Sequence, residues 1–295
     1  MTCRRPVLGV LAAALLAASS VFLSAQQPTF RVNVDLVRVD ALVTERGRPV
    51  AGLTAADFEL KDNDVPQDIQ LATLTETVHV VLALDTSGSV GGQRLDYLKR
   101  ASRSLLNALA PRDAISVLTF NQRVVLRANA EHDRVAVERA IDSLDAGGRT
   151  ALCDAVYAGL SLVAPDTGRS LLLLFSDGGD NASFLSRDAV MASVKHSMAT
   201  IYTVGVRGGE RGMVWPGLLW DLADSGGGSL LWADDDSRLP AVFMTVLNEF
   251  RSRYLLSYTP TGVKRDDGWH KITVTLKTHP GRVKARPGYF ATRTR

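Results

Sequence analysis

Two kinds of hydrophobic pattern follow one another along the chain. Between residues 77 and 250, short apolar runs alternate with segments in which apolar residues recur every three or four positions. The clearest run, Val78–Leu84, is typical of a parallel strand that is covered on both faces. The clearest helical pattern is 239–250, with one apolar face. Strands that alternate with helices predict βαβ crossovers, so we expect a doubly wound, mostly parallel α/β sheet. The other predicted strands are 115–120, 171–175 and 201–206, and the other predicted helices lie at 95–109, 137–144 and 152–160.

The flanks of this region have the two-residue period of β-strands. Residues 37–43 alternate between apolar and polar, and a change of phase at Leu36-Val37 predicts a bulge or a twist. Thr54 with Asp57 is a capping pair, and Asn63-Asp64 predicts a hairpin between strands around 58–60 and 69–71. The C-terminal flank alternates over 254–258 and 270–276. Each flank has too few strands to be stable alone, so we expect them to pair into a single sheet that forms a small accessory β domain.

The N-terminus has the pattern of an export signal. Arg4 and Arg5 form a charged start, 7–18 an apolar centre, and Leu23-Ser24-Ala25 a small-residue end. An uncleaved membrane anchor is the alternative, because 6–25 approaches the length of a membrane span. The predicted organisation is a signal at 1–25, a β segment at 26–76, the α/β domain at 77–250 and a β segment at 251–295. We expect a periplasmic or extracellular protein with no stable membrane span after cleavage.

Composition and cysteine content exclude several classes. The formal net charge of the 295 residues is only +3, and no basic stripe with interleaved aromatic residues is present, which argues against nucleic-acid binding. Cys3 lies in the predicted signal, so Cys153 is the one cysteine of the predicted mature chain; we expect it to be a small buried residue. Histidines at zinc-ligand spacing are absent.

Oxygen-bearing side chains follow the predicted strands at three places. Asp85, Ser87 and Ser89 come directly after the first strand, Asp177 follows the strand at 171–175, and Thr150 precedes a helix. Ligands of open α/β sheets bind beyond the carboxyl ends of the strands. Hard cations such as Mg²⁺ prefer oxygen ligands. We therefore predict a metal site, although Asp85 with its two serines is also a plausible helix cap or turn.

These motifs resemble the metal-ion-dependent adhesion site of von Willebrand factor A domains, over roughly residues 78–250. The flanks, above all 254–260, are similar to those of exported bacterial proteins called VWFA-related. The resemblance implies that Ser87 and Ser89 bind the metal directly, that Asp85 and Asp177 hold it through water, and that Thr150 alternates between the two modes. It also implies Mg²⁺, with Mn²⁺ or Ca²⁺ as alternatives, and a protein partner whose Asp or Glu completes the coordination. In some relatives an occupied site favours movement of the last helix.

Several nearby residues have two interpretations. Arg149 directly precedes Thr150, and it would either repel the metal or contact an acidic ligand. Asp154 is either an outer support for the metal or a solvated helix residue. Asp180 and Asn181 are expected to serve a turn, and the acidic run 234–236 to cap the last helix. The methionines at 191 and 198 and the tryptophans at 215, 220 and 232 are expected to pack in the core or at its rim, although Trp215-Pro216, in a Gly-rich loop, is a candidate for an exposed contact.

Three functional hypotheses follow. The first is a non-enzymatic protein-binding module. The second is a phosphatase of the haloacid-dehalogenase type, which needs an acid two residues after its nucleophilic Asp, where this chain has Ser87. The third is a structural or assembly subunit with an unused metal site. A serine hydrolase is disfavoured, because no Gly-x-Ser-x-Gly elbow is present.

Overall fold

The structure, a computed structural model, describes residues 36–72, 77–163, 169–177, 179–206, 216–264 and 268–291. The predicted signal at 1–25 and Trp215 lie outside these ranges. Within the ranges, no helix combines the length and the hydrophobicity that crossing a membrane requires.

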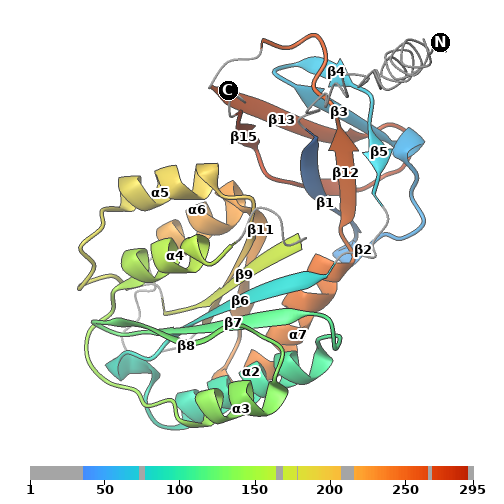
Figure 1. Ribbon diagram of the computed structural model, residues 1–295. Helices are drawn as coiled ribbons and strands as arrows, with labels where there is room; N and C mark the ends of the chain where they lie inside the picture. The colour runs from blue at the N-terminus through green and yellow to red at the C-terminus, as the bar shows by residue number, and fades with distance from the viewer. Residues whose placement is uncertain are drawn as a thin grey trace, which may run out of the picture. The chain divides into compact units, whose positions relative to one another are not determined.

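Six strands form the central sheet, in the order β11-β10-β9-β6-β7-β8 (Figure 1). Neighbouring strands are parallel except for β7 and β8, which are antiparallel. The predicted mostly parallel sheet is therefore confirmed. The strands are β6 (Val78–Asp85), β7 (Ala114–Phe120), β8 (Val124–Glu131), β9 (Arg169–Phe175), β10 (Thr200–Val206) and β11 (Gly227–Ala233).

Helices cover both faces of this sheet, as the doubly wound prediction requires (Figure 1). One layer consists of α2 (Gln93–Ala108), α3 (Arg134–Asp142) and α7 (Leu239–Arg251), and the other of α4 (Leu152–Ser161), α5 (Arg187–His196) and α6 (Pro216–Ser225). The hydrophobic pattern does not predict β8, β11, α5 or α6. Pro216, expected in a loop, instead begins α6, where a proline is tolerated because the first N–H groups of a helix have no intrahelical partner.

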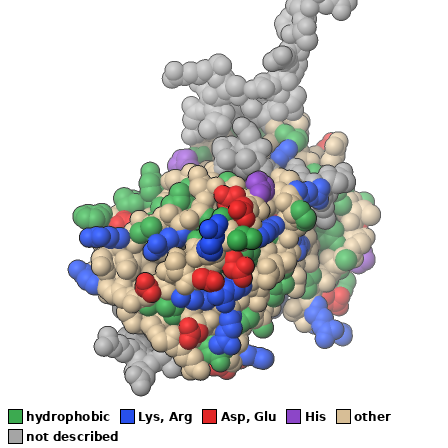
Figure 2. Space-filling model, turned by 60° about the horizontal axis from the view of Figure 1, so that its bottom comes forward, with side chains coloured by type: hydrophobic (Ala, Val, Ile, Leu, Met, Phe, Trp, Pro, Cys, Tyr) green, Lys and Arg blue, Asp and Glu red, His purple; other side chains and the backbone are tan. Residues whose placement is uncertain are grey.

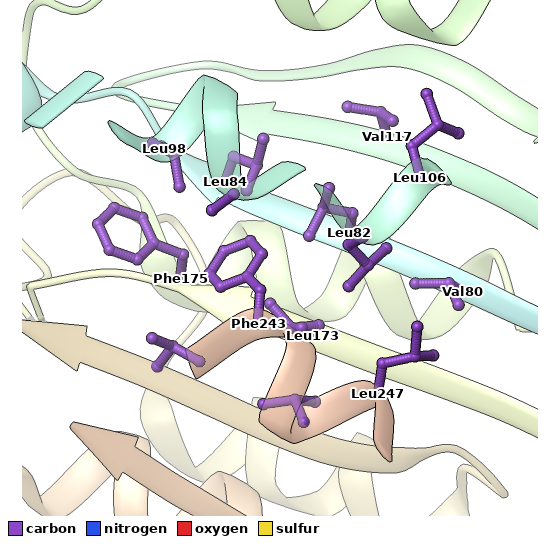
Figure 3. Packing of buried hydrophobic residues seen from close by; sticks show 14 of the residues in the cluster. Val80, Leu82, Leu84, Leu98, Leu106, Val117, Leu173, Phe175, Phe243 and Leu247 are labelled. Carbon is purple, nitrogen blue, oxygen red and sulfur yellow. The ribbon is translucent and has the colours of Figure 1, made fainter. Parts of the chain in front are cut away.

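The alternating directions of side chains along β6 explain why its sequence is apolar at nearly every position. Val80, Leu82 and Leu84 pack with α2 and α7 in one core cluster (Figure 3), and Val81 and Ala83 pack with α4 in the other. All five side chains are fully buried. The buried strand ends at Asp85, so the packing that holds β6 also determines where this carboxylate lies.

The flanks of the chain pair with one another, as predicted, but they form two antiparallel sheets and not the single sheet that was expected. In one, the order is β14-β1-β12-β5, with β2 beside β1; in the other it is β15-β13-β3-β4. Strand β1 pairs with β12 from Val37↔Tyr258 to Ala41↔Tyr254. This pairing joins the N-terminal flank directly to the C-terminal flank. The strands are β1 (Val37–Glu45), β2 (Arg48–Pro49), β3 (Phe58–Asp62), β4 (Val65–Gln67), β5 (Gln70–Leu71), β12 (Tyr254–Tyr258), β13 (Trp269–Leu276), β14 (Arg282–Lys284) and β15 (Gly288–Phe290).

Local signals in the N-terminal flank are partly confirmed. Thr54 and Asp57 form the predicted capping pair, with the Thr54 N–H donating to the Asp57 carboxylate over 2.8 Å. Asn63 and Asp64 have φ angles of 47° and 65°, as a two-residue hairpin turn requires. The partner strand is wrong, however: β4 follows the turn at once, and the segment expected there, around Leu71, belongs to β5 and pairs with β12.

A buried polar cluster links the two flanking sheets. Asp62 is fully buried on β3, and its carboxylate accepts hydrogen bonds from Tyr258 (2.9 Å) and Tyr289 (3.0 Å). His270 Nδ1 lies 2.8 Å from the other carboxylate oxygen. Burial raises the pKa of Tyr258 well above its usual value, so this phenol stays a hydrogen-bond donor. Because Tyr258 lies on β12 and the other three residues lie in the β13 sheet, the cluster connects both layers.

Candidate metal centre

The parallel register of β6 and β9 brings two predicted site segments together. Leu84 pairs with Phe175, so Asp85 and the Ser176-Asp177 segment leave the sheet at the same edge. The Ser176 hydroxyl donates to Asp85 Oδ2 over 2.7 Å. Asp177 is close enough for its charge to raise the pKa of Asp85. The two carboxylates predicted as site residues are therefore neighbours.

The loop after β6 places the two serines beside one another. The Ser87 N–H donates to Asp85 Oδ1 over 2.8 Å, which is the turn that the alternative interpretation expected. The chain then forms a single 3₁₀ turn, η2 (Gly88–Val90), and the Ser87 and Ser89 hydroxyl oxygens lie 3.1 Å apart. The turn at Asp85 and a metal site are therefore not alternatives, because the turn itself positions the Ser87 and Ser89 hydroxyl groups.

Backbone hydrogen bonds connect the Thr150 segment to this loop. The Gly88 N–H donates to the Gly148 carbonyl (3.0 Å), and the Gly147 N–H donates to the Thr86 carbonyl (2.8 Å). Gly148 has a φ angle of +83°, a left-handed conformation that residues with a Cβ atom rarely adopt, so this position favours glycine. Thr150 itself is 5% exposed. Its segment is held between the loop after β6 and the loop after β9.

The loop after β9 is bonded to the start of α4, and this arrangement corrects the interpretation of Asp154. Asn181 Oδ1 accepts from the Thr150 N–H, and the Asn181 N–H donates to the Thr150 carbonyl. The Asp154 carboxylate accepts from the N–H groups of Phe184 (3.0 Å) and Leu185 (2.9 Å). It is therefore not simply a solvated helix residue, because its carboxylate holds the loop after β9. The feature of the sequence that pointed to Asp154 was its position in the first turn of the helix that follows Thr150.

Asp180 also binds the α4 segment. One of its carboxylate oxygens accepts from the Cys153 N–H over 2.9 Å, and the other from the Ser183 N–H over 3.2 Å. The expected turn role of Asp180 is therefore confirmed, with an additional contact to α4. Cys153 is a buried free thiol, as predicted, and burial together with Asp180 raises its pKa to about 12.

An arginine that the sequence did not single out connects the serine loop to the last helix. Arg94, at the start of α2, donates from Nη1 to the Ser89 carbonyl (3.2 Å) and from Nε to Asp236 (2.7 Å). Asp236 begins the 3₁₀ turn η3 (Asp236–Arg238), which leads into α7. Asp235 caps that turn through the Ser237 N–H. The acidic run therefore caps η3, not α7 itself, and one of its members is paired with Arg94.

The electrostatics of the site fit a divalent cation. Asp85 is fully buried, and burial raises the pKa of its carboxyl group to about 6, with a smaller contribution from the charge of Asp177. Hydrogen bonds from Ser87 and Ser176 act in the opposite direction without neutralising the charge. A divalent cation would compensate the two carboxylates, and the neighbouring hydroxyls supply the hard oxygen donors that Mg²⁺, Mn²⁺ or Ca²⁺ prefer. Among the described residues, no group of three His, Cys, Asp or Glu side chains is placed to hold a metal, so hydroxyl groups have to complete this donor set.

Arg149 directly precedes Thr150 in the segment that borders the site. Arg149 is exposed, and its N–H donates to Gln122 Oε1 over 3.0 Å. Figure 2 shows one face of the molecule, on which Lys and Arg side chains are interspersed with Asp and Glu.

Comparisons with known proteins give a family and a fold. A sequence profile of the von Willebrand factor type A domain matches residues 79–239. An uncharacterized protein of Synechocystis sp. is 31% identical over 136 residues, which cover 43% of this chain and 32% of that protein. Inter alpha-trypsin inhibitor, heavy chain 4, of Mus musculus is 23% identical over 207 residues, which cover 64% of this chain and 22% of that protein. The chain thus spans about a third or less of the length of these curated relatives.

Two solved structures share the fold. A von Willebrand factor type A protein from Catenulispora acidiphila aligns with a TM-score of 0.53 at 15% identity, over 85% of this chain and 76% of that chain. Proximal thread matrix protein 1 from the mussel byssus, with a zinc-occupied MIDAS motif, aligns with a TM-score of 0.53 at 16% identity, over 63% of this chain and 48% of that chain. At these identities the likeness concerns the fold alone.

Proposed function

The chain belongs to the von Willebrand factor type A domain family, and we propose that it is an exported, non-enzymatic binding module that captures an acidic side chain of a protein partner through a divalent cation. Domains of this family are often protein-interaction modules with a metal-ion-dependent adhesion site. One observation supports the proposal above the others: Asp85 is a buried carboxylate beside Asp177, and the Ser87 and Ser89 hydroxyls lie together in the adjoining loop.

Each site residue has a role that follows from its position. The Ser87 and Ser89 hydroxyls would contact the ion directly, because they are neutral and adjacent. Asp85 and Asp177 would hold its water ligands and supply negative charge from beneath, and the Thr150 hydroxyl would provide the fifth oxygen. When bound, the ion supplies a positive charge that is only partly neutralised and an open coordination position for a partner's carboxylate oxygen.

The contacts of the acidic residues weigh against the phosphatase alternative. That chemistry needs a second acid two residues after the nucleophilic aspartate, and Ser87 cannot donate and accept a proton as a carboxyl group does. The later acidic run is also committed elsewhere, since Asp235 caps η3 and Asp236 pairs with Arg94. A structural role with an unused metal site stays the alternative that experiment has to separate from partner capture.

Export is proposed from the pattern of the first 25 residues, in which a charged start, an apolar centre and a small-residue end follow one another. Sequencing of the mature N-terminus from a secretion-competent host is the test. Cleavage near Ala25 is expected, and a protein that keeps residues 1–25 would favour the anchor alternative.

Metal titration of the purified protein tests the site itself. Calorimetry with Mg²⁺, Mn²⁺ and Ca²⁺ compares the wild type with Ser87→Ala, and with Ser161→Ala as a matched control, because Ser161 lies at the exposed end of α4. Zinc is included, because a byssus protein of this fold has zinc in its motif. The metal affinity of Ser87→Ala is expected to fall by at least about tenfold, whereas that of Ser161→Ala is expected to stay unchanged. A tenfold loss corresponds to one charge-assisted ligand contact of about 1.4 kcal/mol. Absence of metal binding by the wild type would refute the proposal.

Partner capture is tested with a displayed peptide library. Peptides are bound in Mg²⁺ and Mn²⁺ and eluted with EDTA, and each selected peptide is resynthesised with its acid changed to the amide. Capture that requires both the acid and the metal supports the binding module. Metal binding without any chelator-eluted peptide would favour the structural alternative.

A further inference from the structure

Phe184 is the most exposed of the large apolar side chains in the described residues, at 98%. The next side chain, Leu185, packs against the core cluster of α4, α5 and α6. The loop therefore directs one apolar residue inward and its neighbour fully into water. Burial of a phenylalanine ring is favourable wherever a surface can cover it, so the ring is available for contact with another molecule.

The fold does not use the Phe184 ring. The loop is held through the backbone, with the N–H groups of both Phe184 and Leu185 donating to the Asp154 carboxylate. The Ser183 hydroxyl accepts from the Asp154 N–H over 3.2 Å, and the Ser183 N–H donates to Asp180. A serine at position 184 would make the same backbone contacts. The loop is thus fixed in place by side chains other than the one that it exposes.

The same loop borders the candidate metal centre. Asn181 makes two hydrogen bonds with the backbone of Thr150. Its Oδ1 accepts from the Thr150 N–H over 2.9 Å, and its own N–H donates to the Thr150 carbonyl over 3.0 Å. Asp154, which accepts from the Phe184 and Leu185 N–H groups, lies in the first turn of α4, directly after the Thr150 segment. The Phe184 ring therefore belongs to the same loop that is bonded to Thr150 through Asn181.

We propose that Phe184 is the apolar anchor of the partner-binding surface, so that the partner presents an acidic side chain to the metal and an aliphatic or aromatic side chain to Phe184. The number of residues between this apolar side chain and the acid is a property that the selected peptides report. Aromatic residues dominate the energetics of many protein interfaces, and an ordered loop avoids the entropic cost of fixing the contact. The inference rests on the proposed function and specifies the chemistry of its partner.

The test uses the full chain and a displayed library of peptides with one fixed central Asp and all other positions random. Selections in Mn²⁺ with EDTA elution are run in parallel on the wild type, on Phe184→Ser, and on Trp220→Ser. Trp220 is the matched control, because it is also a large exposed aromatic residue, 54% exposed, but lies on α6.

We expect enrichment of apolar residues at a fixed position relative to the Asp for the wild type and for Trp220→Ser, but not for Phe184→Ser. The best wild-type peptide is expected to bind Phe184→Ser about 10- to 100-fold more weakly, with unchanged Mn²⁺ affinity. Selected peptides without an apolar preference, or with the same preference for Phe184→Ser, would overturn the anchor and leave the metal-dependent capture intact. Failure of the wild type to yield any chelator-eluted peptide would overturn both.

Discussion

Asp85→Asn is expected to stabilise the metal-free protein while it removes metal binding. Asp85 is buried, and the pKa of its carboxyl group is raised from 3.8 to about 6. Folding therefore opposes ionisation of this side chain. Asparagine has nearly the same shape and keeps an acceptor oxygen for the Ser87 N–H, but it carries no charge.

The magnitude follows from the difference in pKa. A shift from 3.8 to about 6 corresponds to about 3 kcal/mol of unfolding free energy at pH values above both. Because the folded-state pKa is the higher one, the folded state binds more protons between the two values, and stability falls as the pH rises from about 4 to about 6. The bond from Ser176 to the second oxygen is weakened by the substitution, which costs about 1 kcal/mol. A net gain of about 1–3 kcal/mol is expected near pH 7.5, and little or none near pH 4.

Urea unfolding in EDTA at both pH values measures this difference. Asp142→Asn is the matched control, since that carboxylate is half-exposed and pairs with Arg103 on the surface; it is expected to change stability by less than about 0.5 kcal/mol. Addition of Mg²⁺ should then stabilise the wild type by mass action and leave Asp85→Asn unchanged. The reasoning is refuted if the metal-free Asp85→Asn protein is less stable than the wild type near pH 7.5, or if the gain is equal at both pH values.

Three further outcomes are expected. Tyr258→Phe removes one donor to the buried Asp62 carboxylate and should lower the unfolding free energy by about 1–3 kcal/mol in urea titrations, and an unchanged midpoint would contradict the cluster's role. Arg94→Lys keeps the charge but loses the two-pronged contact, so Mn²⁺ affinity should fall several-fold at constant stability; Arg103→Lys, on the same helix, should not change it. Gly148→Ala should destabilise the protein by more than about 1 kcal/mol and weaken Mn²⁺ binding in calorimetry; wild-type affinity would show that the left-handed turn is dispensable.

The secondary structure that could be predicted from the sequence is the part with a strong pattern of burial. β6 and β9 are buried along their whole length, and each contains a continuous apolar run, at residues 80–84 and 171–175. β8 is mostly exposed at the edge of the sheet, so no buried apolar run marks it in the sequence. In the accessory region, the turn at Asn63-Asp64 was predictable from local preference. The choice of β4 instead of the segment near Leu71 as its second strand was decided by long-range pairing with β12.

The order of the site motifs along the chain was already informative. Asp85, Ser87 and Ser89 follow one strand whose pattern indicates burial, and Asp177 follows another. Both segments were therefore expected to emerge at the carboxyl ends of parallel strands. This reasoning needs only residue types and periodicity. The spacing of Thr150 before a helix pointed in the same direction.

The contacts that hold these residues were decided by tertiary structure alone. Arg94 and Asp236 are 142 positions apart in the chain, and Asp154 and Phe184 are 30 apart. Hydrogen-bonding side chains of this kind have many possible partners, and only the packing of helices on both faces of the sheet selects one. The sequence alone was enough to specify the buried strands, the turn at Asn63-Asp64 and the order of the oxygen donors along the chain. The folded chain determined which donors meet, because that depends on which distant segments are brought within about 3 Å of one another.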